Sequence, residues 1–419
     1  MKYHALFLAI GLSIALVVAS PMSSWAAVIM NGAMATPGDP SDWNEEADVW
    51  IFHTEGPNGV VLNNMPGITT IVTENLLLGS PVIGGVGKLT VTGLGASWEV
   101  RDLLEVGNLA NSHGVLDVRD GGMIKADRLH LAMSVGSVGV MNVSGGIVLA
   151  NSIEADNGMA NLTLNGGIFQ PLSSTGGFLT GNFNNLYLDG SGLSAGVAAL
   201  TLQVDAGLTV GVSQVFTGDG GLAKTGYGTL VLNGAQSYTG LTDVASGLLT
   251  GEVSFAGGLT VRDGAIFAPG NGIWTTTIGG DYTQEPGAVL AMEIGRFGSD
   301  RLVVGGDVSL GGILALSFTD DIEEGRYVLI ECLGEGVIQY MFDTMMVDGV
   351  LIERDFLYDS FDTAWFPSND WWYMLSSGDG RVELTVSSSP PAGIPEPTAL
   401  ALLALGATVL CGRRRRGTV

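Results

Sequence analysis

Apolar and polar residues alternate in short runs through the middle of the chain, and glycines close most of these runs. Residues 88–93, 115–122, 140–146 and 161–167 are four such units. Alternation with a period of two indicates a β-strand with one buried face. Glycine tolerates the positive φ of a tight turn, so its place after each run indicates a turn. The pattern therefore predicts an all-β fold made of many short strands.

The four units form an internal repeat, in which equivalent apolar residues follow one another at steps of 27, 25 and 21 residues: Leu89, Leu116, Met141 and Leu162. A period in the twenties suits one coil of a β-solenoid, where stacked coils bury the apolar faces that no coil can bury alone. We predict on the order of eleven coils between residues 67 and 318. Because the steps are irregular, one or several β-sandwiches remain the alternative.

Two flanks lack the repeat. The ends of a solenoid expose strand edges that need cover. We therefore predict an N-terminal cap over residues 27–66 and an aromatic-rich β cap over residues 319–388. The tryptophans of the second flank admit another interpretation, since exposed coplanar rings at Trp365, Trp371 and Trp372 would form a sugar-binding surface. Packing over the last coil would bury the same rings.

The N-terminal residues predict export. Lys2 is followed by an apolar run over residues 5–19 and by small residues at Ser24 and Ala26. This order of features is typical of a secretory signal peptide over residues 1–26, cut after Ala26.

The C-terminal residues form a second, three-part export feature. A linker over residues 389–397 ends in a proline-glutamate-proline step, an apolar stretch covers residues 398–412, and residues 413–419 form a basic tail. Proline ends any preceding helix, and clustered arginine holds a segment on the cytoplasmic side. The apolar stretch is shorter than the ~20 residues of a comfortable membrane helix. The residues that carry the feature are Pro395, Glu396, Pro397, Arg413, Arg414, Arg415 and Arg416.

This C-terminal feature resembles the PEP-CTERM sorting signal of Gram-negative bacteria. The resemblance implies that residues 398–412 form a short transmembrane sorting helix, inserted transiently. It also implies that an exosortase, a membrane peptidase, recognises the motif and processes the chain after export through the inner membrane. A permanent membrane anchor is the alternative interpretation of the same residues.

Two stretches of the repeat resemble known repeat families. Residues 93–122 resemble a repeat shared by type V secretion passengers and PEP-CTERM proteins. Residues 221–234 closely resemble the autotransporter-associated β-strand repeat and keep its K-T-G-x-G-T-L core. The resemblance implies a right-handed parallel β-helix carried to the cell surface. Only about 75 residues separate Phe318 from the sorting motif, too few for the membrane barrel that ends a type V autotransporter.

The chain is strongly acidic, with a net charge of −25 at pH 7. Without Lys2 and the four terminal arginines, 12 of its 17 basic residues remain against 42 acidic ones, a net charge of −30. Such a chain repels nucleic acid and anionic lipid. We therefore expect no nucleic-acid partner, and we consider an extracellular polysaccharide the possible external partner.

Residues with catalytic chemistry are scarce. The histidines His53, His113 and His130 stand outside any paired metal-ligand spacing, and His130 is expected to face solvent from a strand. We predict no catalytic residue, no cofactor and no metal site. The predicted function is structural or adhesive, in the extracellular matrix or at the cell surface, and not enzymatic. The alternative, a carbohydrate-active enzyme or sugar-binding module, would need clustered carboxylates, for which Asp117, Asp120 and Asp127 are the candidates.

Overall fold

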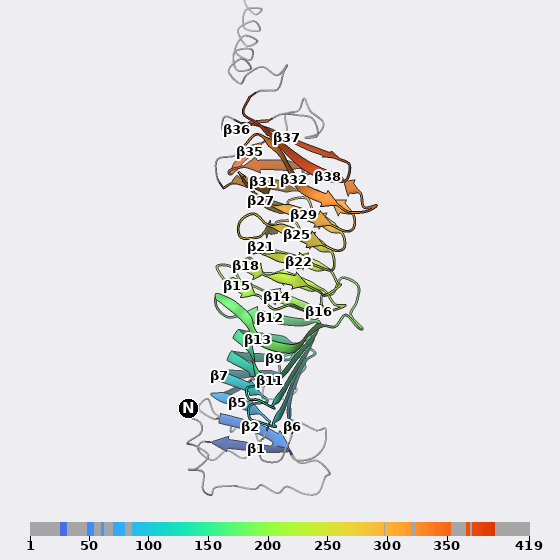
Figure 1. Ribbon diagram of the computed structural model, residues 1–419. Coiled ribbons are helices and arrows are strands. Elements are labelled where there is room, and N and C mark those ends of the chain that lie inside the picture. The colour runs from blue at the N-terminus through green and yellow to red at the C-terminus, as the bar shows by residue number, and fades with distance from the viewer. Residues whose placement is uncertain are drawn as a thin grey trace, which may run out of the picture.

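The computed structural model describes residues 26–31, 48–53, 60–62, 70–79, 86–296, 298–319, 323–352, 366–368 and 371–389. Within these ranges every regular element is a β-strand. No helix among them is long and apolar enough to cross a membrane. The strands stack into an elongated β-solenoid of about 10 turns (Figure 1), which confirms the solenoid prediction. The predicted sorting helix over residues 398–412 lies outside the described residues.

Each coil contributes strands to parallel stacks that run along the solenoid. The first stack contains β4 (Thr70–Thr73), the N-terminal parts of β7 (Ser97–Val106), β9 (Met123–Leu131) and β11 (Ile147–Asn165), then β12 (Gly167–Pro171), β14 (Leu200–Gln203), β17 (Leu222–Thr225), β20 (Thr242–Val244), β23 (Leu259–Val261), β26 (Tyr282–Gln284), β30 (Val308–Ser309) and β33 (Ile338–Gln339). The second contains β5 (Asn75–Leu78), later parts of β7, β9 and β11, then β13 (Thr175–Leu188), β15 (Thr209–Val212), β18 (Thr229–Leu232), β21 (Leu248–Gly251), β24 (Ile266–Pro269), β27 (Val289–Gly295), β31 (Ile313–Phe318) and β34 (Thr344–Val347).

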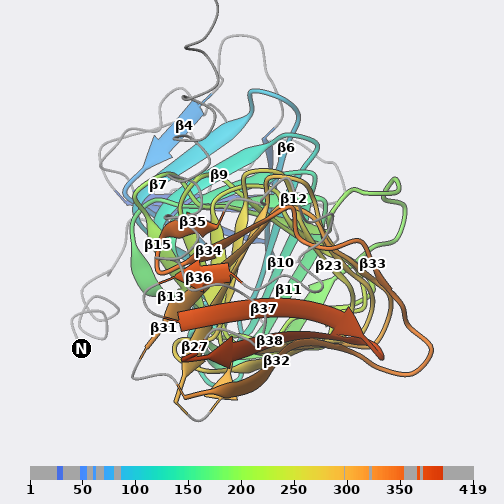
Figure 2. The same cartoon turned by 90° about the horizontal axis from the view of Figure 1, so that it is seen from above.

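The third side of the coils is formed by two successive sets of parallel strands. Its first part contains β3 (Val60–Leu62), β6 (Val86–Thr92), β8 (His113–Arg119), β10 (Val138–Ser144), the ends of β11 and β13, and β16 (Thr217–Gly218). Its second part contains β19 (Gly234–Gln236), β22 (Val253–Phe255), β25 (Thr275–Ile278), β29 (Arg301–Val304) and β32 (Gly325–Cys332). The view along the stack in Figure 2 shows the coils superposed around a common core.

The strand register reproduces the sequence repeat. Leu89 pairs with Leu116, Leu116 with Met141, and Met141 with Leu162, all between parallel strands. All four side chains are fully buried. Parallel pairing of successive repeats places like residues above one another, as stacked coils do and as the antiparallel strands of a sandwich do not. The sandwich alternative is therefore wrong, whereas the right hand of the coil stays a prediction from the resemblance.

Antiparallel strands lie at both ends of the stack (Figure 1). At one end β1 (Ala26–Asn31) pairs with β2 (Asp48–His53), and β2 continues in parallel onto β5. At the other end β36 (Phe366–Ser368), β37 (Trp371–Gly378) and β38 (Arg381–Ser387) form a meander whose last strand pairs with β32. Two short strands form further antiparallel pairs, β28 (Gly298–Ser299) with β27 and β35 (Val350–Ile352) with β34.

The coils continue beyond the expected solenoid range of residues 67–318. Ile313 of β31 pairs in parallel with Thr344 of β34, so one more coil uses residues of the second flank. In that flank Trp372 is buried, and Trp371 packs against the core. Trp372 is therefore not part of an exposed sugar-binding surface, Trp371 is partly buried, and Trp365 lies outside the described residues.

A buried lysine occupies the core position of the K-T-G-x-G-T-L segment. The Lys224 side chain points inward from β17 and is fully buried. Its ammonium donates hydrogen bonds to the carbonyl oxygens of Thr225 (3.1 Å), Gly226 (2.6 Å) and Ser246 (2.8 Å). Burial lowers the pKa of Lys224 to about 8, so the group is still charged at neutral pH. Since Ser246 belongs to the following coil, Lys224 joins two coils from inside.

Candidate functional site

The predicted sorting residues lie outside the described part of the chain, and their roles stay predictions. This holds for Pro395, Glu396, Pro397, Arg413, Arg414, Arg415 and Arg416. Ala26, the predicted cleavage position, is the first residue of β1 and pairs with His53.

The three candidate catalytic carboxylates have separate partners. Asp117 forms a 2.6 Å ion pair with Lys88 and accepts a 2.8 Å hydrogen bond from Asn142. Asp120 lies in an exposed turn and accepts a hydrogen bond from Thr92, while Asp127 accepts one from Asn151. A glycosidase needs two carboxyl groups that flank one bond of the sugar. The structure does not bring these three aspartates together as such a pair.

Outward side chains of neighbouring coils pair along the same face. Lys125 of β9 lies 2.8 Å from Glu99 of β7, and Arg128 lies 2.8 Å from Asp102. Both pairs are partly exposed, so each adds at most about 1 kcal/mol to stability. The first pair follows directly from in-register stacking, because Lys125 is the register partner of Glu99, whereas Arg128 follows a register shift and lies opposite Leu103, the neighbour of Asp102.

One step further along this face lies a compact group of titratable side chains, His130 of β9 with Glu154 and Asp156 of β11. Their ligand-type atoms all lie within 4.8 Å of one another, and no other group of three such side chains meets this spacing within the described residues. His130 Nδ1 lies 2.7 Å from Asp156 Oδ2, and His130 Nε2 lies 3.7 Å from Glu154 Oε2. Instead of facing solvent, as expected from the sequence, the imidazole is 13% exposed.

The preceding coil adds a buried carboxyl group to this cluster. Glu105 of β7 is the register partner of His130 and is almost fully buried. Burial raises the pKa of Glu105, and the charge of Asp156 raises it further, whereas a hydrogen bond from Asn108 lowers it. Sequence reasoning missed the cluster. The sequence feature that could have indicated the cluster is the pair of acidic residues at alternate positions, Glu154 and Asp156, about one coil length after His130.

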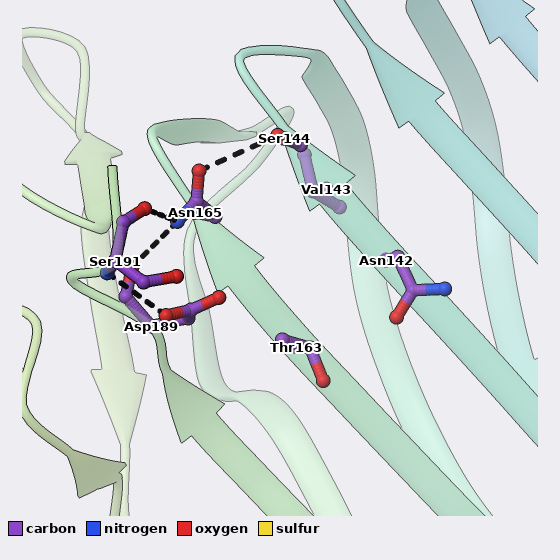
Figure 3. A pocket seen from close by; sticks show the side chains of 7 residues that line it. All are labelled: Asn142, Val143, Ser144, Thr163, Asn165, Asp189 and Ser191. Carbon is purple, nitrogen blue, oxygen red and sulfur yellow. Dashed lines mark hydrogen bonds between the residues drawn. The ribbon is translucent and has the colours of Figure 1, made fainter. Parts of the chain in front are cut away.

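A shallow groove of about 340 Å³ lies on the third side of the coils (Figure 3). Asn165 is central to it, because its amide nitrogen donates to the carbonyl oxygens of Asp189 and Ser191, both at 2.9 Å. The Ser144 hydroxyl donates to the Asn165 side-chain oxygen at 3.4 Å. Because these hydrogen bonds engage the side-chain amide of Asn165 with the protein's own main chain, Asn165 holds the turn at residues 189–191 in place. The residues that line it are Asn142, Val143, Ser144, Thr163, Asn165, Asp189 and Ser191.

Asp300 is a buried acid that joins coils through the main chain. It is fully buried and accepts hydrogen bonds from the amide N–H groups of Trp274 and Glu293, both at 2.7 Å. Burial raises its pKa to about 6 from an ordinary 3.8, although the two hydrogen bonds oppose this. The folded chain therefore binds a proton at Asp300 more tightly than the unfolded chain does.

Because of this pKa difference, Asp300 makes the stability of the fold depend on pH. The stability that protonation of Asp300 supplies is fully present below the unfolded pKa of 3.8 and is lost as the pH rises through about 6. In urea denaturation from pH 7 to pH 4, we expect the wild-type chain to gain on the order of 1 to 3 kcal/mol that Asp300→Asn does not gain. Parallel stability curves for the two proteins would contradict the assignment.

Comparison with known proteins gives a partial similarity. No protein-family model matches the chain. The chain is similar to the adhesin BmaC autotransporter of Brucella suis biovar 1 (strain 1330), with 37% identity over 151 residues. This stretch is 33% of the chain and 4% of the adhesin, so the chain spans a small fraction of that protein's length. The similarity therefore concerns one segment of a much longer adhesin.

Proposed function

We propose that the chain is an exported β-solenoid with a structural or adhesive role at the cell surface or in the extracellular matrix. An exosortase-type membrane peptidase processes it at the motif formed by Pro395, Glu396 and Pro397. The observation that carries the proposal is the continuous parallel stack of about 10 turns, together with the similarity to an autotransporter adhesin. Stacked coils give an extended surface, which suits display and contact.

The chemistry of the outer face supports an external location. The net charge of −25 opposes self-association and contact with anionic surfaces. Outward polar side chains are held by partners in neighbouring coils, as Asn142 is by Asp117 of the preceding coil. A rigid face of this kind presents fixed hydrogen-bonding groups, which suit a neutral or weakly charged extracellular polysaccharide. The predicted signal peptide and basic tail supply the route to that location.

Intact-mass measurement on protein from native cells tests the sorting step. Membrane and culture fractions are compared for the wild type and for a Glu396→Gln variant. We expect the wild-type chain to begin at Ala27 and to lack the segment after the motif, while Glu396→Gln keeps Arg413 to Arg416. A wild-type membrane species that keeps these arginines would make the tail a plain anchor and would refute the sorting proposal.

Cosedimentation with extracellular polysaccharide from the same cells tests the adhesive role separately. The processed protein is expected to sediment with the polysaccharide and to stay in solution without it. If it stays in solution in both cases while the masses show processing, the polysaccharide partner is wrong and sorting stands.

A further inference from the structure

In the cluster around His130, one nitrogen of the imidazole ring forms no hydrogen bond with the described residues. We propose that His130 Nε2 and the Glu154 carboxylate bind a divalent transition-metal ion of the zinc type, and that Asp156 holds the imidazole in the tautomer that binds it. This site lies on the outer face formed by β9 and β11, which are adjacent in Figure 1. It is independent of the export route and of any polysaccharide partner.

The contact with Asp156 fixes the position of the proton on the His130 ring. Asp156 Oδ2 lies 2.7 Å from His130 Nδ1, a hydrogen-bond distance. An ionised carboxylate can only accept a hydrogen bond, so Nδ1 carries the proton. In the neutral ring Nε2 then has a free lone pair. A carboxylate that accepts from the second nitrogen of a metal-binding histidine is a common arrangement around zinc, because it fixes the ring and makes the ligand nitrogen more basic.

His130 Nε2 has no hydrogen-bond partner among the described residues. The atom is also buried. Glu154 Oε2 is 3.7 Å away, beyond hydrogen-bond distance. A lone pair and a carboxylate that face each other without a proton between them repel, and a buried polar atom without a hydrogen bond destabilises the fold. A cation between the two atoms would remove both penalties.

The spacing suits a small metal ion. Zinc binds imidazole nitrogen and carboxylate oxygen at about 2.0 to 2.2 Å. At ~2.1 Å from both Nε2 and Oε2, an ion would subtend an angle of about 120° between them, close to the tetrahedral range. Imidazole is a favoured ligand of zinc, copper, iron and nickel, whereas calcium and magnesium prefer all-oxygen sites. The mixed donors therefore point to a transition metal.

The fold holds the ligands in place without any ion. His130 and Glu154 are register partners on parallel strands, and Asp156 lies two residues further along the same face of β11. Sheet positions of this kind are more rigid than loop positions, which favours binding. Glu105 contributes another acidic group from the preceding coil. The side chains of Glu154 and Asp156 are 35% and 24% exposed, so an ion can reach them and complete its coordination with water.

Titration of the purified full-length mature protein with ZnCl₂ by isothermal calorimetry tests the proposal. We expect one saturable zinc per chain in the wild type and none in His130→Gln or Glu154→Gln. Asp156→Asn keeps both ligands and loses only the orienting carboxylate, so its affinity is expected to fall by about 10- to 100-fold. His113→Gln, which changes an outward histidine of another strand, serves as the matched control and is expected to bind like the wild type.

Cobalt gives an independent readout. Co²⁺ in the site is expected to give a visible absorption band in the wild type that His130→Gln lacks. Circular dichroism checks that each variant is folded, and Glu154→Gln, which changes the more exposed ligand, decides the matter if His130→Gln does not fold. A wild type that binds no zinc, or zinc binding unchanged in the folded ligand variants, would overturn the proposal.

Discussion

Replacement of Gly226 by alanine is expected to destabilise the solenoid by about 3 kcal/mol or more. Gly226 has a φ of +75°, and a Cβ atom there would lie 2.2 Å from the carbonyl oxygen of Val204 in the preceding coil. The neighbouring atom is main chain, so relief requires the coils to separate. The added carbon would also disturb the carbonyl of Gly226, which accepts a hydrogen bond from Lys224.

Gly207→Ala is the matched control for this prediction. Gly207 has a φ of +83°, similar to that of Gly226, but no atom lies within 4 Å of its Cβ position. The control therefore carries only the conformational cost of a left-handed residue, about 1 to 2 kcal/mol. Urea denaturation followed by circular dichroism compares the two variants with the wild type. Equal losses of stability would show that the contact with Val204 does not matter.

The solenoid could be predicted because the spacing of the sequence repeat matches the register between its coils. Coils stack with like residues above one another, so the steps between Leu89, Leu116, Met141 and Leu162 are also the vertical contacts of the core. The K-T-G-x-G-T-L segment likewise indicated a position where coils stack. Its glycines allow close approach of coils, since a Cβ on Gly228 would lie 2.3 Å from the Asp205 carbonyl oxygen.

The His130 cluster could not be predicted in the same way. Its members are 24 and 26 residues apart, and coil lengths vary enough that one extra residue in a turn would turn Glu154 away from His130. Alternation shows that these residues point outward, but it does not show which outward residues of different coils meet. The additional coil after Phe318 was missed for a related reason, because the short strand β33 has no repeat motif.

The end of the solenoid shows how aromatic residues can serve packing rather than binding. Phe318 of β31 stacks on Tyr373 of β37, with ring centroids 5.6 Å apart. Trp372 is only 5% exposed. Strand β37 therefore uses these rings to cover apolar surface at the last coils. This leaves the outer faces of the coils, with their paired polar residues, as the surface available to a partner.

Replacement of Lys224 by methionine is expected to cost about 3 to 5 kcal/mol. The change keeps most of the side-chain volume but removes the Lys224 donor from the carbonyl oxygens of Gly226 and Ser246 inside the core, while the Thr225 carbonyl keeps its bond from the Val204 amide. Lys125→Met is the matched control, because it removes a lysine from a partly exposed ion pair with Glu99 and should cost less than about 1 kcal/mol. Urea denaturation measures both. Similar losses for the two variants would show that the buried hydrogen bonds contribute little.

The pH dependence of stability, compared between the wild type and Lys224→Met, separates the effect of burial on the Lys224 ammonium from the effect of its hydrogen bonds. Burial lowers the pKa of this lysine to about 8 from an ordinary 10.5. Between these values the folded chain binds fewer protons at Lys224 than the unfolded chain does, so stability from this group rises with pH. The advantage of the wild type over Lys224→Met should therefore grow from pH 8 to pH 10. An advantage that shrinks across this range would mean that the three carbonyl oxygens stabilise the charged form of Lys224 more than burial destabilises it.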